Sequence, residues 1–99
     1  MLFRSEWLSG FIEAEGSFSI RTISNNHSFS IGQNDDKFIL DKIKNHFYIT
    51  NQVRKINDRF WIIEVFKKST LINIINHCIE YPLLGEKILS FNKFRDLFN

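Results

Sequence analysis

Apolar and polar residues alternate along two neighbouring stretches near the start of the chain, and this two-residue period is typical of half-buried strands. The stretches are residues 17–24 and 28–33, and the run 24–27 between them has a composition typical of turns. In the second stretch Phe29 and Ile31 face inward, whereas Ser28 and Ser30 face outward. The pattern therefore predicts a β-hairpin.

A second pair of strands is predicted further along the chain. Residues 60–66 are apolar on both faces, and residues 48–56 form a poorer strand in which Gln52 and Arg54 face opposite to Val53. The run Asn57-Asp58-Arg59 between them is typical of a turn.

Helical spacing of apolar residues predicts two helices in the first half of the chain. The first runs from Glu6 to Glu15, with Ser5 as its N-cap and Gly16 just beyond its C-terminal end. The second follows possible N-caps at residues 34–36 and ends near Phe47.

Two further helices are predicted in the second half. Ser69 or Thr70 caps the first of them and Pro82 ends it, while the last helix starts near Leu84. The order of elements is α-β-β-α-β-β-α-α, which predicts an α+β fold.

Composition restricts the class of protein. The 99 residues are 43% hydrophobic and include 11 Phe, which suits one small globular domain over residues 1–99 and excludes disorder. The apolar runs are too short to span a membrane and no leader precedes them, so we expect no membrane partner. The single cysteine, Cys78, excludes an internal disulfide and indicates a buried thiol. The net charge of +2 is compatible with nucleic acid as a partner.

The first helix carries unusual residues for its position. Gly10 and Ala14 lie four residues apart on one face, which leaves room for close packing either against the chain's own core or against another helix. Glu15 stands at the C-terminal end of the helix, where the helix dipole disfavours a carboxylate. Glu15 therefore calls for a cation, and a divalent metal is the strongest candidate.

The run Leu8-Ser-Gly-Phe-Ile-Glu-Ala-Glu-Gly16 resembles the signature of the LAGLIDADG homing endonucleases, with five identities and conservative replacements at the other four positions. Residues 29–43 resemble the second strand and helix of the family, and residues 81–87 resemble its turn into the last helix. The resemblance implies that the α+β elements form a four-stranded antiparallel saddle sheet backed by helices.

One copy of the signature implies a homodimer in which two such helices pack across a two-fold axis. Gly10 and Ala14 would then lie at the seam, and Trp7 would fill its end. Symmetry would bring two Glu15 carboxylates together around Mg²⁺, with the Gly16 carbonyl as a further ligand and with Ca²⁺ or Mn²⁺ as substitutes for binding.

The resemblance also implies which residues surround the scissile phosphate. Glu15 is the principal catalytic candidate, and Gln33, Lys37 and Lys87 are expected to flank the phosphate and order its water. Glu13 is interpreted as a structural residue.

Double-stranded DNA is the implied partner, with no small-molecule substrate. The outward strand residues would face the major groove and nearby cations would contact phosphates. The residues of this DNA-binding set are Ser17, Ser19, Arg21, Ile23, Ser28, Ser30, Gln52, Arg54, Lys55, Ile56, Arg59, Phe60, Ile62, Glu64, Lys67 and Lys68.

The resulting hypothesis is a site-specific double-strand DNA endonuclease of the homing type, which hydrolyses phosphodiester bonds with divalent metal at a palindromic or nearly palindromic site. Two alternatives stay open: an RNA-splicing maturase, and a cleavage-inactive DNA-binding half of a two-motif protein. Abundant Phe, Ile, Asn and Lys have AT-rich codons, which indicates an organellar gene or a microbial intracellular protein.

Overall fold

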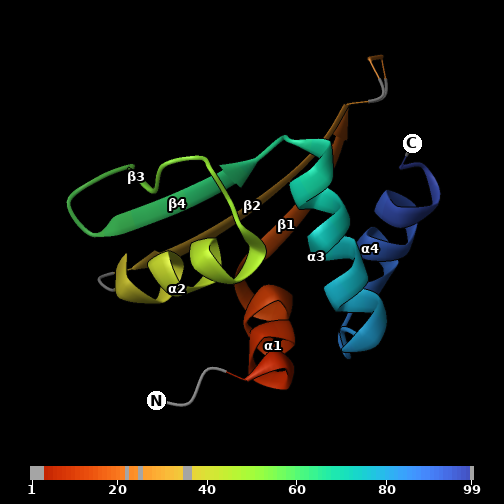
Figure 1. Cartoon of the computed structure of the whole chain (residues 1–99), viewed down its shortest axis with the longest axis horizontal. Coiled ribbons are helices and arrows are strands. Elements are labelled where there is room, and N and C mark those ends of the chain that lie inside the picture. Colours follow the sequence, from red (N-terminus) through yellow and green to blue (C-terminus); the bar gives the residue numbers. More distant parts are fainter. Residues whose placement is uncertain (1–3, 22, 25, 35–36, 99) are drawn as a thin grey trace.

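The structure is a computed structural model, and it describes residues 4–21, 23–24, 26–34 and 37–98. Its elements follow the order that the hydrophobic pattern predicts, so the α+β prediction is confirmed (Figure 1). The elements are α1 (Ser5–Glu15), β1 (Gly16–Arg21), β2 (Asn26–Asn34), α2 (Lys37–Phe47), β3 (Arg54–Lys55), β4 (Phe60–Val65), α3 (Lys68–Glu80) and α4 (Lys87–Asp96).

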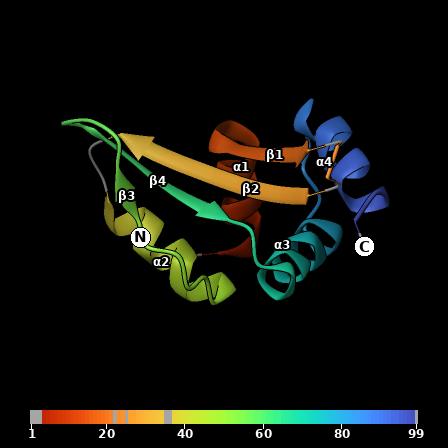
Figure 2. The same ribbon diagram turned by 90° about the horizontal axis from the view of Figure 1, so that it is seen from above.

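The four strands form one antiparallel sheet in the order β1-β2-β4-β3, as Figure 2 shows from above. Gly16, where α1 passes into β1, is paired with Ile31 of β2. Two residues further along β2, Gln33 is paired with Trp61 of β4. Trp61 is in turn paired with Lys55 of β3. The register therefore aligns Gln33, Trp61 and Lys55 in one row across three strands, two residues beyond the partner of Gly16.

One face of the sheet is buried under the helices and the other is open. Phe29, Ile31, Ile63 and Val65 alternate along β2 and β4, and all four are almost fully buried. Side chains from every helix complete this core, including Leu8, Ile12, Leu40, Ile43, Leu71, Ile74, Phe91 and Phe94. Figure 1 shows α1, α2 and α3 on the same side of the sheet, with α1 pointing away from it.

The ends of α1 differ from the prediction in their chemistry. Arg4, not Ser5, is the N-cap residue, and it makes no side-chain capping hydrogen bond. Gly16 does end the helix, but its backbone is extended, with φ −80° and ψ 161°. A glycine is needed there for close packing, because a Cβ would lie 2.8 Å from the Ile12 carbonyl oxygen and 3.1 Å from the Phe29 ring.

The caps predicted for α3 are also wrong, and so is Asn34 as a cap of α2. Ser69 and Thr70 lie inside α3, whose N-cap residue is Lys67 without a side-chain capping bond. Asn34 is the last residue of β2 rather than a helix cap, and Asp35 and Asp36 lie outside the described residues. The last helix begins at Lys87, three residues later than the position predicted for it.

The strand predicted over residues 48–56 is mostly irregular. Only Arg54 and Lys55 pair with β4, so Gln52 and Ile56 lie outside any strand. Residues 17–24 were likewise predicted as one strand, but β1 ends at Arg21, and Ile23 and Ser24 lie beyond it.

Two further expectations concern the cysteine and the length of the apolar segments. The thiol of Cys78 is buried, as predicted, and burial raises its pKa to about 12. In the described ranges, no helix has the length and apolar character required to cross a bilayer.

Candidate functional site

The site begins where α1 meets β1. Glu15 is the last residue of α1, its side chain is exposed, and no basic residue lies in the last helical turn. The backbone carbonyl of the next residue, Gly16, accepts a hydrogen bond from the Nζ of Lys87. Lys87 is the first residue of α4, more than 70 positions away in the sequence. The fold therefore brings the Lys87 ammonium group to the C-terminal end of α1.

Glu13 holds the backbone that carries Lys87. Its Oε1 accepts a hydrogen bond of 3.0 Å from the Gly85 N–H, and its Oε2 accepts one of 3.2 Å from the Lys87 N–H. The first turn of α4 has no acidic residue of its own. A carboxylate from α1 thus caps the N-terminal end of α4, which agrees with the interpretation of Glu13 as structural.

Gly85 leaves the space that this contact needs. A Cβ at position 85 would lie 2.7 Å from the Glu13 carboxylate. Any larger residue would push the Glu13 carboxylate away from the two N–H groups that it binds.

Gln33 and Lys37 lie near the junction of β2 and α2. Gln33 continues the inward-facing series of Phe29 and Ile31 beyond the partner of Gly16. Lys37 begins α2, and its Nζ lies 5.6 Å from the centre of the Trp61 ring. Lys55, assigned to phosphate contact, also places its Nζ 5.4 Å from that ring. The sequence analysis did not single out Trp61, although its position opposite Gln33 follows from the strand register.

The open face of the sheet carries most of the DNA-binding set. Ser17, Ser19 and Arg21 are exposed along β1, and Ser28 and Ser30 are half-buried along β2. Cationic or apolar residues of the set outside the strands are also exposed; these are Ile23, Ile56, Arg59, Lys67 and Lys68. The face is therefore polar and accessible along β1 and β2.

Three members of the set, Phe60, Arg54 and Glu64, contact other residues of the chain. Phe60 lies over Gly32, where a Cβ would come within 2.3 Å of its ring. The Arg54 guanidinium forms an ion pair with the Glu64 carboxylate on the same face, close to Ile62. The positive charge of Arg54 is thus partly balanced before any ligand binds.

An exposed stripe runs along α1. Among the residues that the structure describes, no atom outside its own helix lies within 4 Å of a Cβ built on Gly10, and Ala14 is also exposed. The alternative that these residues pack on the chain's own core is therefore wrong. Trp7 and Phe11 are half-buried on the same stripe, with their rings stacked at 5.3 Å between centres. The stripe leaves an apolar, small-residue surface open to a partner.

A buried polar cluster lies on the other side of α1, and the sequence analysis missed it. The Ser9 hydroxyl donates a 2.5 Å hydrogen bond to the Tyr81 carbonyl, so the His77 Nε2–H, 3.0 Å away, donates to Ser9. Burial, and secondarily the charge of His46, lowers the pKa of His77 to about 4. His77 is therefore neutral near pH 7, and it links α3 to α1.

One chain offers few ligands for a metal ion. No group of three or more His, Cys, Asp or Glu that could hold a metal occurs in the ranges that the structure describes. The Glu15 carboxylate and the Gly16 carbonyl are hard oxygen donors of the kind that Mg²⁺ prefers, but Mg²⁺ takes six ligands. The donors fit the metal in type, and the remaining ligands must come from water, a phosphate or a second chain.

Comparison with solved structures identifies the class of protein. The homing endonuclease I-TnaI superposes with a TM-score of 0.81 at 26% identity, over 97% of this chain and 71% of that one. The LAGLIDADG meganuclease I-CpaMI, in a structure described as bound to uncleaved DNA, superposes with a TM-score of 0.83 at 25% identity, over 96% of this chain and 37% of that one. The fold is that of the LAGLIDADG endonucleases.

Residues 8–98 match the family model described as LAGLIDADG endonuclease, and the chain belongs to this family. A curated relative from Dictyostelium citrinum, "Probable intron-encoded endonuclease aI3", is 52% identical over 95% of this chain and 38% of its own length. A relative of the same description from Debaryomyces hansenii is 53% identical over 89% of this chain and 13% of its own length. The chain thus spans well under half of these relatives.

Proposed function

We propose that this chain is the cleaving unit of a site-specific double-strand DNA endonuclease, which acts as a homodimer with divalent metal on a palindromic or nearly palindromic site. The observation that carries the proposal is the contact of the Lys87 Nζ with the carbonyl of Gly16, the residue that follows the exposed Glu15. The contact joins the Lys87 ammonium to the Gly16 carbonyl, which is next in sequence to the Glu15 carboxylate. Phosphodiester hydrolysis needs a cation and oxygen ligands of these kinds.

The accessible polar face of the sheet supports DNA as the substrate. Its serines and Arg21 lie on β1 and β2, and a ribbon of two antiparallel strands has the dimensions to enter a major groove. The structures of I-CpaMI and of I-GzeII, which is 26% identical to this chain, are described as DNA complexes. This chain is likewise proposed to bind DNA, with the open face of its sheet.

The chain's own residues take the following roles in the proposal. Glu15 and the Gly16 carbonyl would hold the metal, which would supply Lewis-acid stabilisation of the phosphate and lower the pKa of a water. Lys87 donates to the phosphate once its ammonium leaves the Gly16 carbonyl for the ligand. Gln33 and Lys37, on the adjoining end of β2 and start of α2, orient the water and balance phosphate charge.

Two copies are needed because one chain supplies one Glu15. The exposed stripe of Trp7, Gly10 and Ala14 is the proposed seam between the copies, since small residues let two helices approach closely. The relatives are considerably longer, so the same seam also suits a second unit within a longer chain. The abundance of residues with AT-rich codons and the relatives described as intron-encoded support an organellar gene.

Incubation of the purified chain with a randomised duplex library in Mg²⁺, followed by sequencing of the cut ends, tests the proposal. We expect cleavage at one family of symmetric sites and none in EDTA. Binding of the same duplexes without cleavage in Mg²⁺ would contradict an endonuclease activity. It would favour a cleavage-inactive, DNA-binding half of a two-motif protein. Binding to intron RNA in preference to duplex DNA would favour the maturase.

A further inference from the structure

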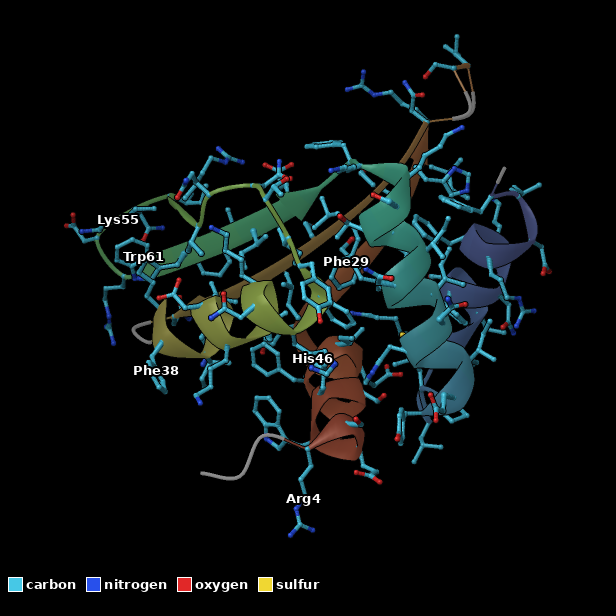
Figure 3. All side chains as sticks on the ribbon, in the orientation of Figure 1. Arg4, Phe29, Phe38, His46, Lys55 and Trp61 are labelled. Carbon is cyan, nitrogen blue, oxygen red and sulfur yellow. The ribbon has the colours of Figure 1, made fainter. Side chains whose placement is uncertain are left out.

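Trp61 brings together two lysines that the sequence keeps 18 positions apart. Its ring centre lies 5.6 Å from the Lys37 Nζ and 5.4 Å from the Lys55 Nζ. The two lysines come from different elements, since Lys37 begins α2 and Lys55 ends β3. Figure 3 shows Trp61 and Lys55 beside each other at the end of the sheet near the start of α2.

The strand register fixes the position of the ring. Trp61 is paired with Gln33 on one side and with Lys55 on the other. It is half-buried and packs against the core, on the same face of β4 as the buried Ile63 and Val65. The indole is therefore held by the sheet, whereas the lysine side chains are long and would otherwise be free to rotate.

The face of an indole ring attracts an ammonium group through its quadrupole but does not neutralise its charge. Two ammonium groups near one ring therefore make a concentrated positive site. In the described part of the chain, the recorded ion pairs are Arg54 with Glu64 and Arg95 with Asp96, and neither involves these lysines. A doubly charged site of this kind suits an anion with several oxygen atoms.

We infer that Trp61 is a positioning residue that holds Lys37 and Lys55, both exposed at this end of the sheet, as a pair of cations for the phosphate backbone of DNA, next to Gln33. The inference rests on the proposed function for the identity of the anion. It adds that Lys37 and Lys55 act as a unit and that their arrangement depends on the indole.

The first test requires no DNA. In the free protein, NMR signals of the Lys37 and Lys55 ε-methylene protons should be shifted upfield by the indole, and Trp61→Leu should remove this shift. Phe38→Leu is the matched control, because Phe38 makes the same kind of contact with Lys42, at 5.0 Å, on the exposed part of α2. It should leave the Lys37 and Lys55 signals unchanged. Unshifted signals in the wild-type protein would overturn the positioning role.

The second test measures affinity for a short duplex of arbitrary sequence over a range of salt concentrations. Trp61→Leu should weaken binding about 2- to 5-fold for each lysine and flatten the dependence on salt. The same substitution in a Lys37→Ala/Lys55→Ala background should have no further effect. Trp61→Phe keeps an aromatic ring and should therefore retain most of the affinity. If the Leu variant does not fold, the Phe variant still tests whether a ring at this position supports binding.

The outcomes separate the inference from the proposed function. If the wild-type chain does not bind duplex DNA, the proposed function fails even where the NMR shifts are present. If the wild-type chain binds and Trp61→Leu weakens binding equally with and without the two lysines, only the positioning role is overturned.

Discussion

The Glu13 side chain helps to position Lys87. Its carboxylate accepts the N–H groups of Gly85 and Lys87, and the Lys87 side chain then reaches the carbonyl that follows Glu15. Two neighbouring acids of the signature thus have different tasks: Glu13 caps α4 and Glu15 stays open at the surface.

Glu13→Gln is expected to destabilise the chain by about 1 kcal/mol, because an amide loses the charge at the N-terminal end of α4 and accepts only one of the two N–H groups. Urea unfolding measures the change. Glu6→Gln, an exposed substitution of the same type on α1, is the control and should alter stability by less than about 0.5 kcal/mol. Equal stability of the two variants would show that the cap contributes nothing.

Tyr48 occupies a conformation that suits glycine. It has φ 58°, its N–H bonds the Asn45 carbonyl, and the following Ile49 N–H bonds the Lys44 carbonyl, which together close α2 in a Schellman motif. Its side chain is 79% exposed, so little packing holds it there.

Tyr48→Gly should therefore stabilise the chain by about 0.5–1 kcal/mol, since relief of the left-handed strain exceeds the added freedom of the unfolded chain. Thermal unfolding measures the gain. Tyr48→Ala retains the Cβ and should give no such gain, and an equal gain for both variants would refute the explanation.

At the scale of elements, the packing of α1 against α3 depends on a neutral histidine. His77 is buried, donates to Ser9 on α1, and its ring stands next to that of His46 on α2. Burial also lowers the pKa of His46. A proton added to either ring would have to be accommodated between three helices.

Acid is expected to weaken this packing. The pKa of His77 is about 4 in the folded chain and 6.5 as a free side chain. Between these values the unfolded chain binds more protons, so the free energy of unfolding falls as the pH decreases from 6.5 to about 4. In urea unfolding, His77→Gln keeps a donor for Ser9 and should show a smaller fall over this range. An unchanged dependence on pH would contradict the assignment.

The periodicity of apolar residues predicted which helices and strands form. The residues at which the helices begin were predicted less well, because the prediction relied on capping residues. The inward series of Phe29 and Ile31 follows directly from side-chain spacing, whereas spacing placed Gly10 and Ala14 on one face without deciding whether that face is exposed. Ser5 and Ser69 have the chemistry of caps, but the helices begin at or before them, because tertiary packing sets these boundaries. Likewise β3 is short, since only Arg54 and Lys55 form residue pairs with β4 in the sheet.

The candidate site was predictable only in part. The signature indicated Glu15, and the turn at residues 81–87 indicated Lys87. The contact between Lys87 and Gly16, the Ser9–His77 link and the place of Trp61 depend on residues far apart in the sequence, and no local pattern indicates such pairs.

At the scale of the whole molecule, the open stripe of α1 is the proposed contact with a second copy. Gly10→Leu leaves the helix intact, since Leu is the better helix former and the space beside Gly10 is open within one chain. We therefore expect a folded monomer that has lost cleavage, as measured by sedimentation velocity and a cleavage assay. Ser90→Leu, on the exposed part of α4, should remain dimeric. A dimeric and active Gly10→Leu protein would exclude this stripe as the interface.

The central claim is that each chain of a dimer uses its Glu15 to cut one DNA strand. Glu15→Gln removes the charge from an exposed helix end, so the variant should fold and bind DNA but lose cleavage.

The most direct measurement mixes wild-type and tagged Glu15→Gln chains, isolates the mixed dimers, and treats a supercoiled plasmid that carries the selected site. The account predicts a nicked circle from mixed dimers, a linear product from wild-type dimers and no cut from Glu15→Gln dimers. A linear product from Glu15→Gln dimers at a rate near that of the wild type would contradict the account.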